Sequence, residues 1–192
     1  MSVASYIIIA LAMGLVNMLL FRRCGEATPI RLSAGLVVVM VVAVVHAVLY
    51  YLGFAVGSLL CISSPDDPYM FDDVNAYIFL GMVIVVTVKM LLPYLRKEPR
   101  VPYFNLRDAK SVVAMAAATG INVLLVGIGV GFVEGENRVH LILWPLLAFS
   151  LLLGYLGLML GRQKVRLRPR RWMVLAGVLL LATAIAACVN AG

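Results

Sequence analysis

The stretch LSAGLVVVMVVAVVHAVLYYLGFAVGSLL, residues 32–60, contains no acidic residue, lysine or arginine. A run of this length is typical of a transmembrane helix, because about 20 helical residues cross the hydrocarbon core of a bilayer. Its apolar residues occupy every face, whereas the strands of membrane barrels alternate in polarity over about ten residues. The stretch therefore indicates a helical membrane protein.

The rest of the chain repeats this pattern. Apolar residues make up 64% of the 192-residue sequence and charged residues only 13%. Since each crossing takes about 20 residues, about six crossings fit and no soluble domain remains. Met1 to Ser5 contains no basic residue of the kind that begins a signal peptide, so we interpret the first segment as a retained helix. We expect an all-α integral membrane protein with six transmembrane helices at Ser5 to Phe21, Leu32 to Leu60, Ala76 to Leu95, Val112 to Val133, Val139 to Gly161 and Trp172 to Val189.

Charged residues change sign from one loop to the next. Apart from Lys89 and Arg138, every lysine and arginine falls in segments 22–31, 96–110 or 162–171. Cytoplasmic loops are enriched in basic residues, so we predict an N-out, C-out topology. The net charge of +7 is assigned to the membrane surface, and its division among three loops argues against nucleic-acid binding. The intervening loops contain Asp66, Asp67, Asp72, Asp73, Glu134 and Glu136.

Two similar motifs suggest an internal duplication. Asn17-Met18-Leu19-Leu20 lies in the first predicted helix and Asn122-Val123-Leu124-Leu125 in the fourth. Three helices per half is an odd number of crossings, so the halves are expected to be inverted relative to each other. We divide the single membrane domain, 1–192, into repeat one (about 1–95), a basic cytoplasmic linker (about 96–110) and repeat two (about 111–192). Inversion lets the two asparagines approach one site near the midplane.

Small residues accompany these motifs. Gly14 and Gly120 precede the asparagines, and Gly127, Gly129 and Gly131 form a stripe farther along the fourth helix. Such a stripe permits close approach of another backbone, either in ordinary helix packing or at a transport site. Exposed small-residue stripes also leave a homodimer open.

Polar side chains within the predicted spans are the candidate site residues. The amides of Asn17 and Asn122 must find partners, because an unpaired amide in hydrocarbon costs several kcal/mol. Thr119 shares a helix face with Asn122. His46 is either a metal ligand or proton acceptor in a wet cavity, or a hydrogen-bonded packing histidine. Lys89 either extends to the inner surface or holds a positive charge beside a pathway. These five residues are the predicted substrate-binding set.

The other polar residues carry less information. Thr87, Ser150 and Thr183, like Thr119, can return a hydrogen bond to their own helices. Cys61 and Cys188 are both expected near the outer surface, which leaves a disulfide between them open. No phosphate-binding loop, dinucleotide fingerprint, nucleophile elbow or spaced zinc-ligand motif is present, so we expect neither an enzyme nor a bound cofactor.

Four glycine-containing motifs recur along the chain. They are Ala12-Met13-Gly14-Leu15-Val16-Asn17, Leu52-Gly53-Phe54-Ala55-Val56-Gly57, the segment 119–129 (TGINVLLVGIG) and Leu156-Gly157-Leu158-Met159-Leu160-Gly161-Arg162. Together these motifs resemble the MntP manganese efflux pump family over nearly the full chain. That family is similar to the LysE-like exporters, which are inverted three-plus-three helix bundles in the bacterial cytoplasmic membrane. The resemblance implies a multi-pass exporter at that location, driven by an ion gradient or the membrane potential.

The chain departs from the family at its acidic positions. The resemblance implies aspartates where Asn17 and Asn122 stand, a glutamate at His46 and an acid near Met173, whereas the basic residue at Lys89 is kept. Mn²⁺ prefers carboxylate, carbonyl and water oxygens, and a buried dication needs anionic compensation. A metal set of Asn17, Asn122 and His46 would therefore bind manganese weakly. A neutral, zwitterionic or anionic solute, or a softer metal through His46, suits these residues better.

We therefore expect a membrane transporter that resembles manganese efflux pumps. It would export a small ion or solute by alternating access at a midplane site lined by the first, second, fourth and fifth helices. The transported species would be Mn²⁺, another cation or a non-metal solute, and the surrounding partner is the lipid bilayer. The alternative is a non-transporting scaffold or accessory subunit that retains the bundle.

Overall fold

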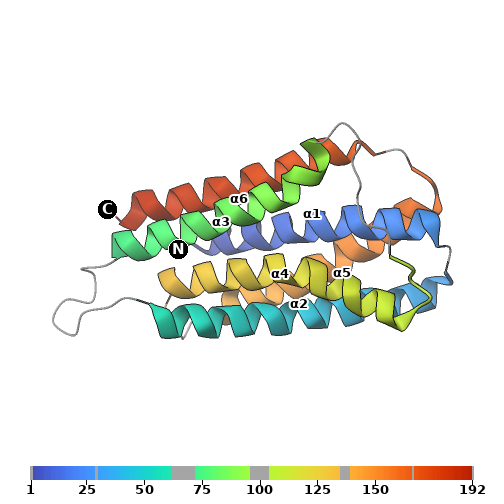
Figure 1. The fold of residues 1–192 in the computed structure, drawn as a ribbon, viewed down its shortest axis with the longest axis horizontal. Helices are drawn as coiled ribbons and strands as arrows, with labels where there is room; N and C mark the ends of the chain where they lie inside the picture. The colour runs from blue at the N-terminus through green and yellow to red at the C-terminus, as the bar shows by residue number, and fades with distance from the viewer. Residues whose placement is uncertain are drawn as a thin grey trace.

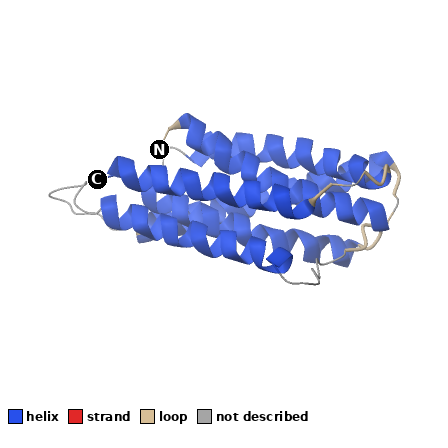
Figure 2. Cartoon of the chain, turned by 90° about the horizontal axis from the view of Figure 1, so that it is seen from above, coloured by secondary structure: helices blue, strands red, loops and turns tan. Residues whose placement is uncertain are grey.

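The computed structural model describes residues 2–28, 30–61, 72–95, 104–134, 139–165 and 167–191. These residues form helices only, and six of the helices are long and apolar enough to cross a membrane (Figure 1; Figure 2). The predicted all-α fold is therefore confirmed. The helices are α1 Val3–Ala27, α2 Leu32–Leu60, α3 Asp72–Leu95, α4 Ala109–Val133, α5 Val139–Arg162 and α6 Pro169–Ala191.

Helix ends differ from the predicted ones where side chains satisfy the backbone. α1 begins at Val3 because the hydroxyl of Ser2 caps it, accepting from the amide of Ser5 at 3.3 Å. It continues past Phe21, where Arg22 Nε donates to the carbonyl of Val165 at 2.9 Å. α4 begins at Ala109, earlier than predicted, because the carboxylate of Asp108 accepts from two amides of the first turn.

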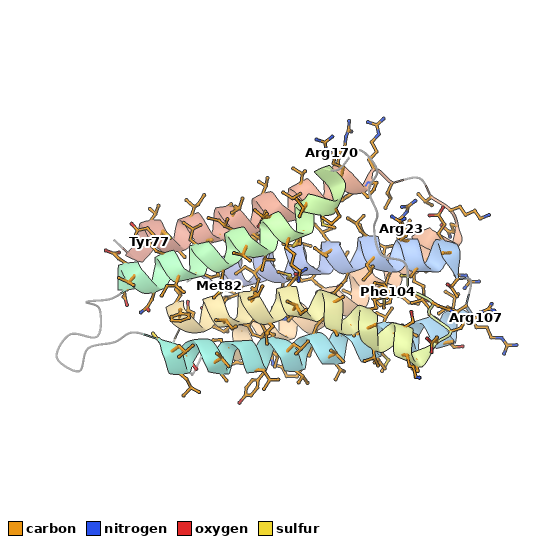
Figure 3. The ribbon with its side chains drawn as sticks, in the orientation of Figure 1. Arg23, Tyr77, Met82, Phe104, Arg107 and Arg170 are labelled. Carbon is orange, nitrogen blue, oxygen red and sulfur yellow. The ribbon has the colours of Figure 1, made fainter. Side chains whose placement is uncertain are left out.

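The basic residues gather at one end of the bundle. Both chain termini lie at the opposite end (Figure 1). Arg23, Arg107 and Arg170 lie toward the end opposite the termini, which we call the basic end (Figure 3). Tyr77 lies near the termini, at what we call the terminal end (Figure 3). The separation agrees with the predicted charge pattern, and the N-out, C-out orientation stays a prediction.

The helices associate in a regular set of pairs. The most extensive contacts join α1 to α5 and α2 to α4. Further contacts join α3 to α6, α3 to α4, α1 to α6 and α2 to α5. If α1 is exchanged with α4, α2 with α5 and α3 with α6, the same set of contacting pairs results. The two halves therefore interlock, and each closely packed pair takes one helix from each half.

Glycines bring the backbones of both major pairs into contact. A Cβ atom at Gly157 or Gly161 of α5 would collide with carbonyl oxygens of Met18 and Arg22 in α1. The small-residue interpretation as helix packing is therefore confirmed, within one chain. In the α2–α4 pair, the corresponding collisions would occur between Gly53 and Leu124, Gly57 and Ile128, Gly127 and Tyr50, and Gly131 and Phe54.

The two close contacts lie at opposite ends of the bundle. Gly157 and Gly161 are at the end of α5 that leads to Arg162, which is the basic end. Gly53 and Gly57 are in the last part of α2, toward the terminal end. Glycines therefore bring α1 and α5 closest together toward the basic end, and α2 and α4 closest together toward the terminal end.

Candidate functional site

A buried hydrogen-bond network lies in the middle of the bundle. Asn17 Nδ2 lies 3.1 Å from His46 Nδ1 and donates to Ser150 Oγ at 3.2 Å. His46 Nε2 lies 2.8 Å from Thr119 Oγ1. The side chains of Asn17, His46 and Ser150 are each at most 3% exposed. Four helices, α1, α2, α4 and α5, therefore meet through polar groups at one depth.

The bonding pattern assigns the donors. The hydroxyl of Thr119 donates to the carbonyl of Met115 at 2.9 Å, one turn earlier in α4. The same hydroxyl therefore accepts from His46 Nε2, and Nδ1 accepts from the amide of Asn17. In this arrangement the imidazole is neutral and both ring nitrogens are occupied.

Asn122 lies beside this network without a partner. Its side chain is 8% exposed, and Oδ1 has no hydrogen bond to any residue that the structure describes. Such unsatisfied buried groups are rare and often mark a bound water, ion or ligand. Thr119, one turn earlier on the same face, takes the bond that His46 offers to α4.

Asn122 and Thr119 line a cavity of about 140 Å³. Lys89 of α3 is the charged side chain among the described residues that line it. The cavity extends toward Pro93 and Phe104, near the basic end (Figure 3). α1, α3, α4 and α6 enclose it, and its lining comprises Val16, Leu20, Lys89, Met90, Pro93, Phe104, Ala118, Thr119, Asn122 and Met173.

The five sequence-predicted residues therefore divide into two adjoining groups. Asn17, His46 and Thr119 form the network, and Lys89 and Asn122 line the cavity, with Thr119 belonging to both. Asn17 is not part of the cavity lining, although its neighbour Val16 is. We expected α2 and α5 to line the site; they contribute residues to the network but none to the cavity lining.

Sequence reasoning missed Ser150. We expected its hydroxyl to return a bond to its own helix, whereas the structure shows it accepting from Asn17. The spacing of the glycines in the sequence could have identified Ser150. The shift along the chain that brings Gly53 and Gly57 onto Gly157 and Gly161 also brings His46 onto Ser150. In the predicted repeat, Ser150 would correspond to His46.

The described residues do not assemble a conventional metal site. No group of three or more histidine, cysteine, aspartate or glutamate side chains lies close enough to hold a metal within that part of the chain. His46 would have to release Asn17 or Thr119 before binding a cation. The metal set of Asn17, Asn122 and His46 stays a prediction. No disulfide joins Cys61 to Cys188, and their Sγ atoms donate to the carbonyls of Phe132 at 3.3 Å and Ala76 at 3.4 Å.

Comparison with known families decides the relationship. The family model described as "Mntp: Putative manganese efflux pump" matches residues 29–187. The chain belongs to the Mntp family. The Mntp match contains His46, Thr119, Asn122 and Lys89, whereas Asn17 precedes it. No curated protein and no solved structure matches the chain.

Proposed function

We propose that this Mntp protein is an exporter that moves a small ion or solute across a bacterial cytoplasmic membrane by alternating access. The central observation is the network of Asn17, His46, Ser150 and Thr119 beside a cavity that contains an unpaired amide. Polar groups inside a membrane bundle are expensive and usually mark a transport pathway. The family resemblance gives the direction of transport.

The helix pairs support a rocking motion. α1–α5 is tightest at the basic end and α2–α4 at the terminal end. The helices of each pair can then separate at the end that lacks these close glycine contacts. This is the behaviour expected of two inverted repeats that rotate about a central site. The exchange symmetry of the contacting pairs supports the same arrangement.

The present conformation fits one half of such a cycle. The cavity extends from Asn122 toward the basic end. On the other side of the network, the aromatic rings of Tyr6, Tyr50 and Phe79 are at most 1% exposed and fill the bundle. With the basic end in the cytoplasm, this is an inward-open state. Substrate would enter past Phe104 and Lys89.

A labelling experiment tests alternating access without knowledge of the substrate. The shift that brings Asn17 onto Asn122 brings Met13 onto Ala118. Ala118 lines the cavity, whereas Met13 is 3% exposed. In a background with its native cysteines replaced by alanine, Ala118→Cys should react with a membrane-impermeant thiol reagent from the basic side. Met13→Cys should react from the terminal side, in the second state.

A buried residue of α5 provides the control for this labelling experiment. Leu158→Cys, fully buried in α5, should remain unlabelled from both sides of sealed vesicles. If Met13→Cys is as silent as Leu158→Cys under every membrane potential and ion gradient applied, the bundle does not alternate. The non-transporting scaffold would then be the better description.

Complementation tests whether the substrate is manganese. The chain and its Asn17→Asp/Asn122→Asp variant would be expressed in a manganese-hypersensitive strain. Rescue by the double variant alone would mean that the fold supports transport and that the native site has another substrate. If the native chain rescues fully and Asn17→Ala/Asn122→Ala rescues equally well, the proposed site is wrong.

A further inference from the structure

We infer that the cavity between α1, α3, α4 and α6 binds a small singly charged anion rather than a metal cation. The inference rests on the proposed exporter function and names the substrate class. It is carried by the basic residue in the cavity lining, by the unpaired amide of Asn122 and by the extension of the cavity toward Phe104 at the basic end.

The charge of the lining favours an anion. Lys89, whose side chain is exposed, is the basic residue among the described lining residues, and the remaining polar groups are the neutral side chains of Thr119 and Asn122. Coulomb energies are several times larger near a protein interior than in bulk water. A dication would therefore meet repulsion without a compensating carboxylate. A monoanion would neutralise the ammonium group of Lys89.

The amide of Asn122 supplies the second contact. Turning about the Cβ–Cγ bond exchanges its oxygen for the NH₂ group, which offers two donors. In the arrangement present in the structure, the oxygen has no hydrogen-bond partner among the described residues. An oxyanion held between the NH₂ group of Asn122 and the ammonium of Lys89 would satisfy both side chains. Two donors on different helices would also explain why the amide is retained in an apolar bundle.

The apolar remainder of the lining limits the size of the ion. Val16, Leu20 and Met173 surround the polar groups. The volume of about 140 Å³ admits several water-sized groups, since one water needs roughly 10–15 Å³. Ions between nitrate and a small carboxylate fit this space. Large polyanions such as nucleotides do not.

The cavity extends toward the basic end, which is the side from which an exported anion would arrive if that end is cytoplasmic (Figure 3). The basic end concentrates arginines that attract anions to the entrance (Figure 3). A negative-inside membrane potential drives a monoanion outward. Export of such an ion would need no coupling ion, whereas export of a dication against that potential would need one.

Electrical recording of reconstituted protein tests the inference. Proteoliposomes in sodium gluconate, on a supported membrane, would receive jumps of sodium nitrate, sodium formate, sodium lactate or manganese gluconate. We expect currents with the sign of a moving anion for at least one sodium salt, and none for manganese. The Lys89→Gln variant should lower that current at least tenfold, and Lys89→Arg should retain it. The exposed Lys164→Gln variant is the matched control and should match the wild type.

A binding measurement covers the case in which a variant misfolds. Purified wild-type protein should melt at a higher temperature in nitrate, formate or lactate than in gluconate, and Asn122→Leu and Lys89→Gln should lose this shift while remaining monodisperse. Cation-sign current with manganese alone would overturn the inference and leave export intact. Absence of both current and melting shift with all three anions would also overturn it. In that case the labelling of Met13→Cys still reports on alternating access independently.

Discussion

Replacing Asn17 by valine should destabilise the bundle through the central network. The amide of Asn17 makes hydrogen bonds to Ser150 and His46, at 3.2 and 3.1 Å. A hydrogen bond between membrane helices contributes roughly 0.6–1.7 kcal/mol, so the pair contributes about 1–3 kcal/mol. Ser150 can then bond to its own helix, whereas the buried Nδ1 of His46 is left unpaired at a cost of about 1–3 kcal/mol. We expect a total loss of about 2–6 kcal/mol.

The assay is reversible unfolding in mixed micelles, followed by far-ultraviolet circular dichroism. Thr183→Val is the matched control, because the hydroxyl of Thr183 bonds only the carbonyl of Leu180 in its own helix, at 2.7 Å. Its free energy of unfolding should change by less than about 0.5 kcal/mol. The Asn17→Val/His46→Leu double variant should lose about 1 kcal/mol less than the sum of its single variants. Equal losses for Asn17→Val and Thr183→Val would refute the network as a stabilising element.

Other features give further expectations. Gly57→Leu places a side chain against the backbone of Ile128 and should abolish a monodisperse peak in size-exclusion chromatography, whereas Gly81→Leu, with open space around it, should not. Lys164 has a φ of 53°, so Lys164→Gly should raise the free energy of unfolding by about 0.5–1 kcal/mol in the same micelle assay. Burial, and secondarily Asp72, raise the pKa of Cys61. Its maleimide labelling rate, measured with the other cysteines replaced by alanine, should therefore keep rising at pH values where an ordinary thiol has reached its plateau.

The membrane fold could be predicted because hydrocarbon imposes a simple rule on sequence. The uncharged stretch around His46 leaves a helix as the structure that satisfies its own backbone. The helix ends were less predictable, since they depend on particular side chains. α1 ends at Ala27, where the amide of Thr28 donates to the carbonyl of Cys24, and Arg22 within this last part donates to Val165, which lies far away in the sequence.

The candidate site could be predicted in its members but not in its connections. The cost of a buried amide singled out Asn17 and Asn122, and both are buried. Their different roles follow from packing, because Thr119 reaches His46 first and leaves Asn122 unpaired. Asn17 instead bonds to His46 and Ser150.

The interlocked helix pairs also affect how the protein is made. α1 is buried along most of its length, and its closest partner, α5, is synthesised more than a hundred residues later. During translation α1 must therefore wait in the membrane without the bond from Asn17 to Ser150 of α5. A shorter delay applies to α2 until α4 emerges. Correct assembly thus depends on protecting early helices until the end of the chain has entered the membrane, and truncated nascent chains are expected to be substrates for membrane quality control.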